Sequence, residues 1–173
     1  PAGLWLRPAY YGRKDEAERC IAEEARAVRE GVGLIDVSTL GGLDVRGPDA
    51  AELLERMYTF AYARLPVGRS RYVQMCERAG AVMDDGVACR FHDRHFYVTA
   101  TTGAADQVYR EMLWHNAQWR LDVDVANVTA AYAGINVAGP RSRDVMAKLA
   151  EDVDLSAAAF PYLGVREGRV AGV

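Results

Sequence analysis

The same short pattern occurs twice in this chain. A β-rich run ends at Gly47-Pro48 in GGLDVRGPDAAELLERM, and a second run ends at Gly139-Pro140, 92 positions later, in AGINVAGPRSRDVMAKL. In both copies the residues after Gly-Pro have the apolar spacing of an amphipathic helix, and proline suits the first helical position because its missing N–H would be unpaired there. A Gly-Pro pair before a helix is common, so coincidence is the alternative. The match on both sides of each pair favours two pseudo-repeated strand–helix units in an α+β fold.

The segment between the two copies has the pattern of an antiparallel meander. SRYVQMC (70–76), VMDDGVACRF (82–91) and FYVTATT (96–102) are strand-like runs separated by the polar turns ERAG and HDRH. Amphipathic helices are expected over residues 14–29 and from about 104 to 114, the second with Val108 and Met112 on one face. LDVDV (121–125) alternates as a half-exposed strand does. The sequence therefore predicts an antiparallel sheet with flanking helices.

Charge and composition argue against several classes of partner. The formal net charge of −3 gives no sign of nucleic acid binding, and no apolar run approaches the roughly 20 residues of a membrane span. Three cysteines, an odd number in apolar surroundings, predict reduced thiols and a cytoplasmic location rather than a disulfide framework. His92 and His95 bracket a turn without the further ligands that zinc requires, so they are interpreted as solvated turn residues and no metal site is predicted.

The two ends of the sequence bear on its organisation. It begins without an initiator methionine and stops inside the strand-like run GRVAGV. We therefore expect a piece of a longer protein, with residues 1–173 forming a single domain that is truncated at its C-terminal end.

Two adjacent carboxylates, Asp84 and Asp85, interrupt the apolar run GAVMDDGVACRF. Side chains alternate along a strand, so Asp84 is expected to reach solvent or Arg90, while Asp85 lies on the other face. The other residues of that face are apolar: Met83, Val87, Cys89 and Phe91. In one interpretation the pair forms a turn or bulge whose carboxylates cap backbone N–H groups. In the other, Asp85 faces a pocket and holds a cationic or proton-bearing ligand atom. The pattern alone leaves both open.

Three long stretches resemble the folate-binding fold of the aminomethyltransferase (glycine-cleavage T-protein) superfamily. They are GLIDVSTLGGLDVRGPDAAELL, LPVGRSRYVQMCERAGAVMDDGVACR and VAGPRSRDVMAKL, and the similarity covers nearly the whole chain in the family's order. Three features resemble the branch of sarcosine oxidase α subunits. Ser-Thr-Leu-Gly at 38–41 replaces the Ser-His-Met-Gly usual in T-proteins, and the other two are Gly-Leu-Trp-Leu-Arg-Pro at 3–8 and Asp-Asp-Gly-Val at 84–87.

The resemblance implies a tetrahydrofolate site. Asp85 matches an aspartate that lies close to the folate nitrogen bridging towards the pterin, which implies a catalytic, proton-accepting role. Leu40, Tyr72, Val87 and Tyr162 match positions that line the folate in relatives. The implied activity is capture of the one-carbon unit from the oxidative demethylation of sarcosine, as 5,10-methylene-tetrahydrofolate.

The resemblance also implies cofactors and partners outside this chain. Flavin and NAD are expected on other parts of a hetero-oligomer that contains a flavin-bearing β subunit and further subunits, and the isolated chain is expected to be inactive. Two alternatives remain open. One is the aminomethyltransferase of the glycine cleavage system, against which the missing Ser-His-Met-Gly counts. The other is a non-catalytic folate-binding or assembly module.

Overall fold

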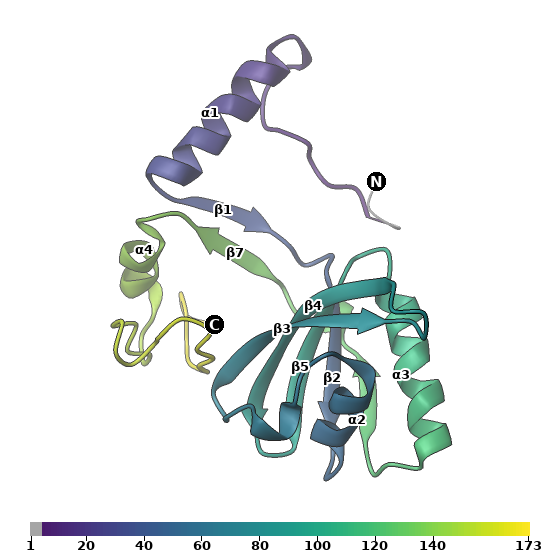
Figure 1. Cartoon of the computed structure of the whole chain (residues 1–173). Coiled ribbons are helices and arrows are strands. Elements are labelled where there is room, and N and C mark those ends of the chain that lie inside the picture. Colours follow the sequence, from purple (N-terminus) through teal and green to yellow (C-terminus); the bar gives the residue numbers. More distant parts are fainter. Residues whose placement is uncertain (1–4) are drawn as a thin grey trace.

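The computed structural model describes residues 5–173, within which the strands form two antiparallel sheets (Figure 1). The larger sheet has the order β3-β4-β5-β2-β6, and the smaller consists of β1 and β7. The larger sheet contains β2 (Gly41–Arg46), β3 (Arg69–Cys76), β4 (Val82–His92), β5 (His95–Ala100) and β6 (Asp124–Asn127). The smaller contains β1 (Gly33–Asp36) and β7 (Ile135–Ala138). Gly3 and Leu4, which open the lead-in used for the resemblance, lie outside the described residues.

Helices flank these sheets, so the predicted α+β class with antiparallel pairing is confirmed. The α-helices are α1 (Ala17–Glu30), α2 (Ala50–Met57), α3 (Ala105–Trp119) and α4 (Ser142–Leu149). Short 3-10 helices are η1 (Lys14–Glu16), η2 (Tyr62–Arg64) and η3 (Thr129–Ala131). The helix expected over 104–114 continues to Trp119, and its Val108 and Met112 are buried as predicted.

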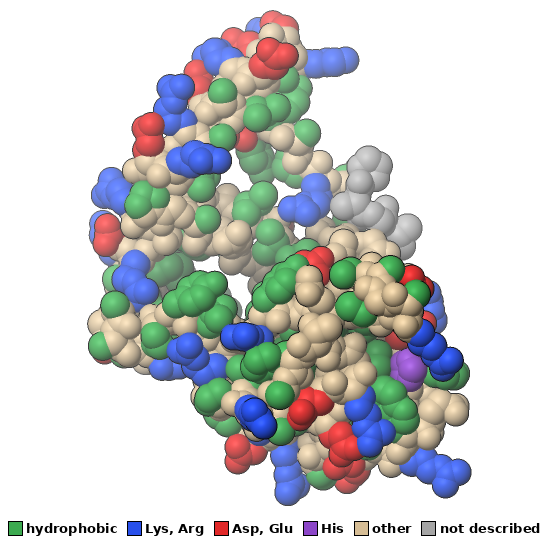
Figure 2. All heavy atoms as spheres, viewed as in Figure 1, with side chains coloured by type: hydrophobic (Ala, Val, Ile, Leu, Met, Phe, Trp, Pro, Cys, Tyr) green, Lys and Arg blue, Asp and Glu red, His purple; other side chains and the backbone are tan. Residues whose placement is uncertain are grey.

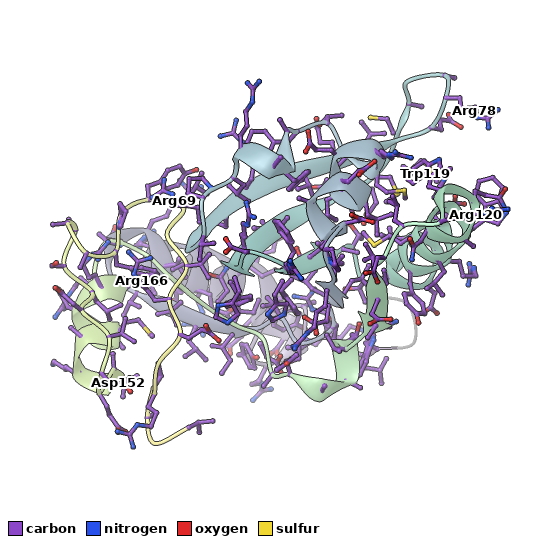
Figure 3. All side chains as sticks on the ribbon, turned by 90° about the horizontal axis from the view of Figure 1, so that it is seen from below. Arg69, Arg78, Trp119, Arg120, Asp152 and Arg166 are labelled. Atoms are coloured by element: carbon purple, nitrogen blue, oxygen red, sulfur yellow. The ribbon has the colours of Figure 1, made fainter. Side chains whose placement is uncertain are left out.

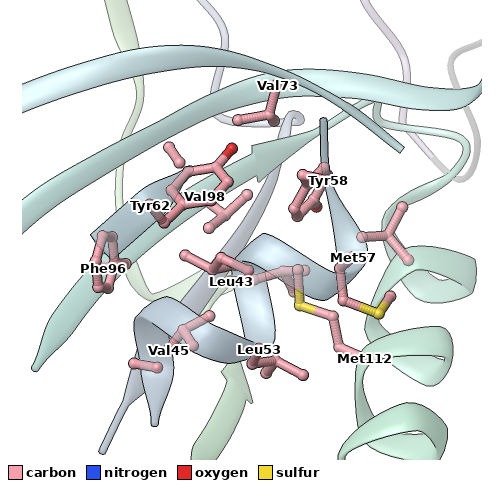
Figure 4. Packing of buried hydrophobic residues seen from close by; sticks show 14 of the residues in the cluster. Leu43, Val45, Leu53, Met57, Tyr58, Tyr62, Val73, Phe96, Val98 and Met112 are labelled. Atoms are coloured by element: carbon pink, nitrogen blue, oxygen red, sulfur yellow. The ribbon is translucent and has the colours of Figure 1, made fainter. Parts of the chain in front are cut away.

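The hydrophobic core lies between one face of the larger sheet and helices α2 and α3 (Figure 4). The side chains of β2 and β5 alternate, so Leu43 and Phe96 point into the core while Asp44 and Tyr97 lie on the opposite face. Burial of each large apolar side chain contributes about 1.5–3 kcal/mol. The core therefore fixes one face of the sheet against the helices and leaves the other face available for a site.

The repeated strand–helix pattern forms the same local structure twice. Helices α2 and α4 begin at Ala50 and Ser142, 92 positions apart, and each has eight residues. Ala50 N donates to Gly47 O, and Ser142 N donates to Gly139 O, with both glycines at positive φ. The expectation that each proline takes the first helical position is wrong. Each proline lies two residues before the first helical residue, because a turn that begins at the glycine connects the strand to the helix.

The two halves of the chain exchange strands. The order α1-β1-β2-α2 is followed later by α3-β6-β7-α4, but β2 pairs with β6, and β7 pairs with β1. The register is also repeated, with a shift of 91 instead of 92 positions on one side. Leu43 pairs with Asn127, and Ile135, which is 92 positions after Leu43, pairs with Asp36, which is 91 positions before Asn127. The units predicted from sequence are therefore interlocked through pairings between distant segments.

The two halves differ in their packing. Leu53 and Leu54 of α2 are fully buried, whereas no side chain of α1 or α4, both within the described part of the chain, is buried. On the small sheet Leu34 is 67% exposed and Ile135 is 58% exposed. The space-filling view shows a hollow between α1 with its adjoining strands and the body formed by the larger sheet (Figure 2). Only one copy of the repeat therefore contributes to the core described above.

Candidate functional site

The two aspartates of β4 have opposite environments. The register of β3 and β4 shifts at Met75 and Cys76, which leaves Met83 as an extra residue just before Asp84. Asp84 is 8% exposed and accepts a hydrogen bond from Thr101 N at 3.1 Å. The expectation that Asp84 reaches solvent or Arg90 is therefore wrong, because its side chain caps a backbone N–H on the core side of the sheet.

Arg90 has other partners. Its guanidinium donates to Leu65 O at 2.7 Å and to Asp93 O at 2.8 Å. It also lies 5.1 Å from the centre of the Phe96 ring. Arg90 therefore connects the β4–β5 turn to the loop before β3, and it does not pair with Asp84 or Asp85.

Asp85 points to the opposite face of the sheet, where it is exposed. The Tyr72 hydroxyl on the neighbouring strand donates to Asp85 Oδ2 at 2.6 Å. The alternation along β4 was predicted correctly, but the assumption that the face of Asp85 is the buried one was wrong. The core side is set by Ala88 of β4 and by its partner Val98 of β5, both fully buried.

Tyr72 keeps its proton in this pair. Its hydrogen bond to Asp85 is the main cause of a raised pKa for the phenol, and burial and the nearby charges of Asp85 and Asp84 act in the same direction. Gln74, which lies opposite Asp85 in the strand register, lowers that pKa by a smaller amount. The Tyr72 side chain is 54% exposed, so its ring is open to a ligand while its hydroxyl is engaged with the carboxylate.

Val87 follows Asp85 on the same face of β4 and is half-buried. Its N–H donates to Thr99 Oγ1 at 2.8 Å. Gly86 between them packs against the next strand so closely that a Cβ there would lie 2.0 Å from Thr99 O. The glycine of the Asp-Asp-Gly-Val motif therefore permits the close approach of β4 and β5 behind the candidate site.

Leu40 and Tyr162 lie at different ends of the larger sheet. Leu40 is 37% exposed and immediately precedes β2. The first residue of β2, Gly41, pairs with Ala100, which is next to the Thr101 N–H that Asp84 caps. This places Leu40 at the same end of the sheet as Asp85. Tyr162 is 86% exposed and lies at the sheet edge near the start of β3.

The C-terminal segment forms that edge. Ser70 N donates to Leu163 O at 2.8 Å, and Val165 N donates to Gly68 O at 2.8 Å. Arg166 also donates to Gly68 O, and Figure 3 shows Arg69 and Arg166 beside this segment. The structure therefore brings Tyr72, Asp85 and Val87 together, with Leu40 at the same end, and leaves Tyr162 further along the sheet.

A hollow of about 440 Å³ lies on the same face of the sheet and was not predicted from the sequence. Tyr97 of β5 pairs with Cys89 of β4, which lies four residues beyond Asp85. The lining residues are Asp44, Arg46, Phe91, His95, Tyr97, Tyr132, Ala133, Gly134 and Glu167. The alternation of HFYVTA could have placed Tyr97 on this face, because Phe96 and Val98 occupy the core positions.

His95 is part of this hollow and is not the solvated turn residue that was expected. Its Nε2 lies 2.5 Å from Asp44 Oδ1, and the two side chains are 20% and 14% exposed. Asp44 also accepts from Arg46 Nε at 2.6 Å. His95 opens β5 rather than the turn, so the strand carries it against β2. His92 is exposed as expected.

Cys89 lies between the two parts of this face. Its thiol is free, and burial raises its pKa to about 11. A thiol with a raised pKa carries little thiolate near neutral pH, so Cys89 is a poor nucleophile. Among residues 5–173 no three or more His, Cys, Asp and Glu side chains form a group able to hold a metal ion. No helix in the same range has the length and apolar character needed to cross a membrane.

Comparisons with known proteins identify the family to which the chain belongs. The GCVT N-terminal domain family model matches residues 1–173. Sarcosine oxidase subunit alpha of Corynebacterium sp. (strain U-96) is 45% identical over 168 residues, which are 95% of this chain and 17% of that protein. The subunit alpha of Rhizobium meliloti (strain 1021) is 36% identical over 178 residues, 98% of this chain and 18% of that protein. The chain thus spans less than a fifth of these relatives.

Similarity extends to a second group of enzymes. The aminomethyltransferase of Corynebacterium aurimucosum is 34% identical over 172 residues, 99% of this chain and 44% of that protein. Among solved structures, the glycine cleavage system aminomethyltransferase T from Bartonella henselae superposes with a TM-score of 0.70 at 24% identity, over 75% of this chain and 35% of that one. At 24% identity, this superposition is evidence for a shared fold alone.

Proposed function

Because this chain belongs to the GCVT N-terminal domain family, we propose that residues 1–173 form the folate-binding part of a sarcosine oxidase α subunit. In this role the chain captures, as 5,10-methylene-tetrahydrofolate, the one-carbon unit released from sarcosine. The observation that carries the proposal is the Tyr72–Asp85 pair on the open face of the sheet. It is supported by 45% identity to a protein named as that subunit.

The residues of this face fit tetrahydrofolate. The ligand consists of flat rings joined by amine nitrogens, and such rings bind well against aromatic walls with a few convergent polar groups. Tyr97 and Tyr132, whose ring centres are 6.1 Å apart, border the hollow, and the exposed ring of Tyr72 lies nearer Asp85. Asp85 Oδ1 is available for a ligand amine because Tyr72 occupies Oδ2. Leu40, Val87 and Tyr162 are proposed as further folate contacts.

Tetrahydrofolate would supply the amine nitrogen that takes up a one-carbon unit at the oxidation level of formaldehyde. When the nitrogen lone pair forms the new N–C bond, positive charge develops on that nitrogen and its proton must leave. We assign Asp85 to stabilise this charge and accept the proton, a role worth about a hundredfold or more in rate. The other residues of the face hold the two reactants in the orientation that the reaction needs.

We place the oxidation of the N-methyl amine on other parts of a larger assembly. Flavin and NAD would bind there, and a flavin-bearing β subunit and further subunits would be partners of this chain. The coverage of 17% of a protein named as a subunit supports this division. A cytoplasmic location is proposed from the three free cysteines.

The proposal is tested with Asp85→Asn in the full-length enzyme. Amine oxidation should be largely retained, while the yield of methylene-tetrahydrofolate should fall about a hundredfold and formaldehyde should be released instead. Asp93→Asn is the control, since that carboxylate is 91% exposed in the β4–β5 turn. Asp84→Asn should have a smaller effect than Asp85→Asn. An unchanged folate product in Asp85→Asn would remove this residue from the mechanism.

The 34% identity to an aminomethyltransferase favours a second candidate, transfer of an aminomethyl group in the glycine cleavage system. Sarcosine-dependent oxygen consumption by the full-length protein supports sarcosine oxidase, whereas folate-dependent release of ammonia from an aminomethyl-lipoyl protein supports the alternative. A non-catalytic folate-binding module would give neither activity and would still bind tetrahydrofolate in a calorimetric titration.

A further inference from the structure

The hydrogen bond between Tyr72 and Asp85 joins adjacent strands across a diagonal. Tyr72 pairs with Val87 in the ladder, and Gln74 pairs with Asp85, so the phenol reaches along β3 to meet the carboxylate. The O–O distance of 2.6 Å is typical of a hydroxyl that donates to an ionised carboxylate, the stronger class of hydrogen bond. Within residues 5–173, the Asp85 side chain makes this hydrogen bond and no other.

An exposed aspartate without such a partner would rotate freely about its side-chain torsions. Exposed side chains change rotamer on the picosecond to nanosecond timescale, and each arrangement that turns the carboxylate away from the ligand is unproductive for proton transfer. The backbone of Tyr72 is fixed by its pairing with Val87 in the β3–β4 ladder. The Tyr72 hydroxyl therefore limits the orientations of Asp85 and directs the second oxygen away from β3.

We propose that Tyr72 is a positioning residue, whose hydroxyl holds Asp85 Oδ2 so that Asp85 Oδ1 receives the proton from the folate nitrogen. This inference rests on the function proposed above. The carbon would enter with a double bond to nitrogen or oxygen, and as the folate nitrogen forms the N–C bond, one electron pair of that double bond moves to this atom, which takes up a proton and departs as amine or water when the second folate nitrogen binds the carbon. The proton of the first folate nitrogen passes to Asp85 and later leaves to solvent. Tyr72 does not take that proton, because its hydroxyl is already the donor in the pair. The raised pKa of the phenol agrees with this role.

The alternative is that Tyr72 only contacts the folate rings. Its ring is 54% exposed and is retained in Tyr72→Phe, whereas the hydrogen bond to Asp85 is lost. If the hydroxyl acts through Asp85, this substitution should slow folate capture about five- to tenfold, the effect expected for one hydrogen bond, and change the tetrahydrofolate dissociation constant less than about twofold. If the hydroxyl binds folate directly, affinity and capture should fall together.

The test is a double-mutant cycle in the full-length enzyme, with Tyr72→Phe, Asp85→Asn and the double variant. Methylene-tetrahydrofolate formation and tetrahydrofolate affinity are both measured. Tyr11→Phe, at a tyrosine that is 71% exposed in the N-terminal segment, is the matched control and should behave as the parent. Residues that act as a unit are non-additive, so the double variant should lose no more activity than Asp85→Asn alone.

Three results would overturn the inference. The first is full capture in Tyr72→Phe, and the second is a loss in the double variant equal to the product of the two single losses. The third is a drop in folate affinity that matches the drop in capture. A parent enzyme that forms no methylene-tetrahydrofolate, or an Asp85→Asn variant that forms it normally, would refute the proposed function itself, and the role of Tyr72 with it.

Discussion

Asp84 and Asp85 are adjacent in sequence but lie on opposite faces of the sheet, and the capping interpretation holds for Asp84. Asp84 follows the extra residue of a bulge and caps Thr101 N, as expected of a structural carboxylate. Asp85 is exposed on the open face with Tyr72, and its role in binding a ligand stays a prediction. The alternation along a strand could predict that they face opposite sides. It could not predict which side is buried, because both faces of β4 carry small or apolar residues and the core is built by β2 and β5.

This difference predicts unequal effects of the two substitutions on stability. Asp84→Ala should lower the free energy of unfolding by about 1–3 kcal/mol, since it leaves the Thr101 N–H without its partner in a nearly water-free position. Asp85→Ala, at an exposed position, should change it by no more than about 0.5 kcal/mol. Urea unfolding of the isolated chain measures both values. Equal losses in the two variants would contradict the assignment of a structural role to Asp84 alone.

Cys89 gives a second prediction at this scale. Burial raises the pKa of its thiol from 9.0 to about 11, so at pH 8 the thiolate fraction should be about a hundredfold below that of an unperturbed thiol. In a variant with Cys20→Ala and Cys76→Ala, alkylation by iodoacetamide should be slower than that of a free thiol by about this factor. The rate should rise tenfold per pH unit until about pH 11. A rate that levels off near pH 9 would show that Cys89 is not desolvated.

At the scale of elements, patterns within one segment predicted the helices and strands better than they predicted which strands pair. The apolar spacing in α1 and α3 and the alternation in β5 depend on neighbours in sequence, so these elements were found with errors mainly at their ends. The exchange of strands between the two halves depends on contacts between segments such as β1 and β7, about a hundred positions apart. No pattern within one segment encodes such a partner. His95 was misplaced for the same reason, since Asp44 comes from a distant strand.

The turn between β2 and α2 can be tested by adding one methyl group. Gly47 has a φ of +142°, and a Cβ there would lie 2.2 Å from Asp122 O in the segment before β6. Gly47→Ala should therefore lower the free energy of unfolding by about 3 kcal/mol or more, because backbone strain and a clash with the backbone of that segment add together.

The matched control is Gly80→Ala in the β3–β4 turn. Gly80 also has positive φ, at +88°, but a Cβ there would have no atom within 4 Å. Its cost should be the strain alone, about 1–2 kcal/mol. Thermal or urea unfolding of the two variants separates the contributions. Similar losses in both would mean that the β2–α2 turn adjusts and that its contact with the segment before β6 does not constrain the fold.

For the whole molecule, the two halves repeat in topology and differ in packing. Both strand–helix units have the same turn and nearly the same strand register, yet the core gathers around β2 and α2, while α1 and α4 bury no side chain within the described chain. The repeat in the sequence predicted two similar units. The repeat did not show that the helices of one unit would bury no side chain. An amphipathic pattern indicates that a helix face is suited to burial, but it does not identify the element that covers this face.

Hydrogen exchange should reveal this difference in the isolated chain. Leu34 of β1 is 67% exposed, whereas Leu43 of β2 is fully buried. Amides in the β1–β7 ladder should therefore exchange through local opening, at least about a hundredfold faster than those in the β2–β5 ladder, which open only with the core. Mass spectrometry of peptides from the two sheets measures both rates.

Leu43→Ala should then affect the two sheets differently. Removal of this core side chain costs about 2–5 kcal/mol of global stability, so exchange in the β2–β5 ladder should accelerate sharply. Exchange in the β1–β7 ladder should stay nearly constant, because its amides already open without the core. If exchange accelerates in both ladders together, β1 and β7 unfold as one unit with the core. The open face beside Asp85 then depends on the whole molecule rather than on the larger sheet alone.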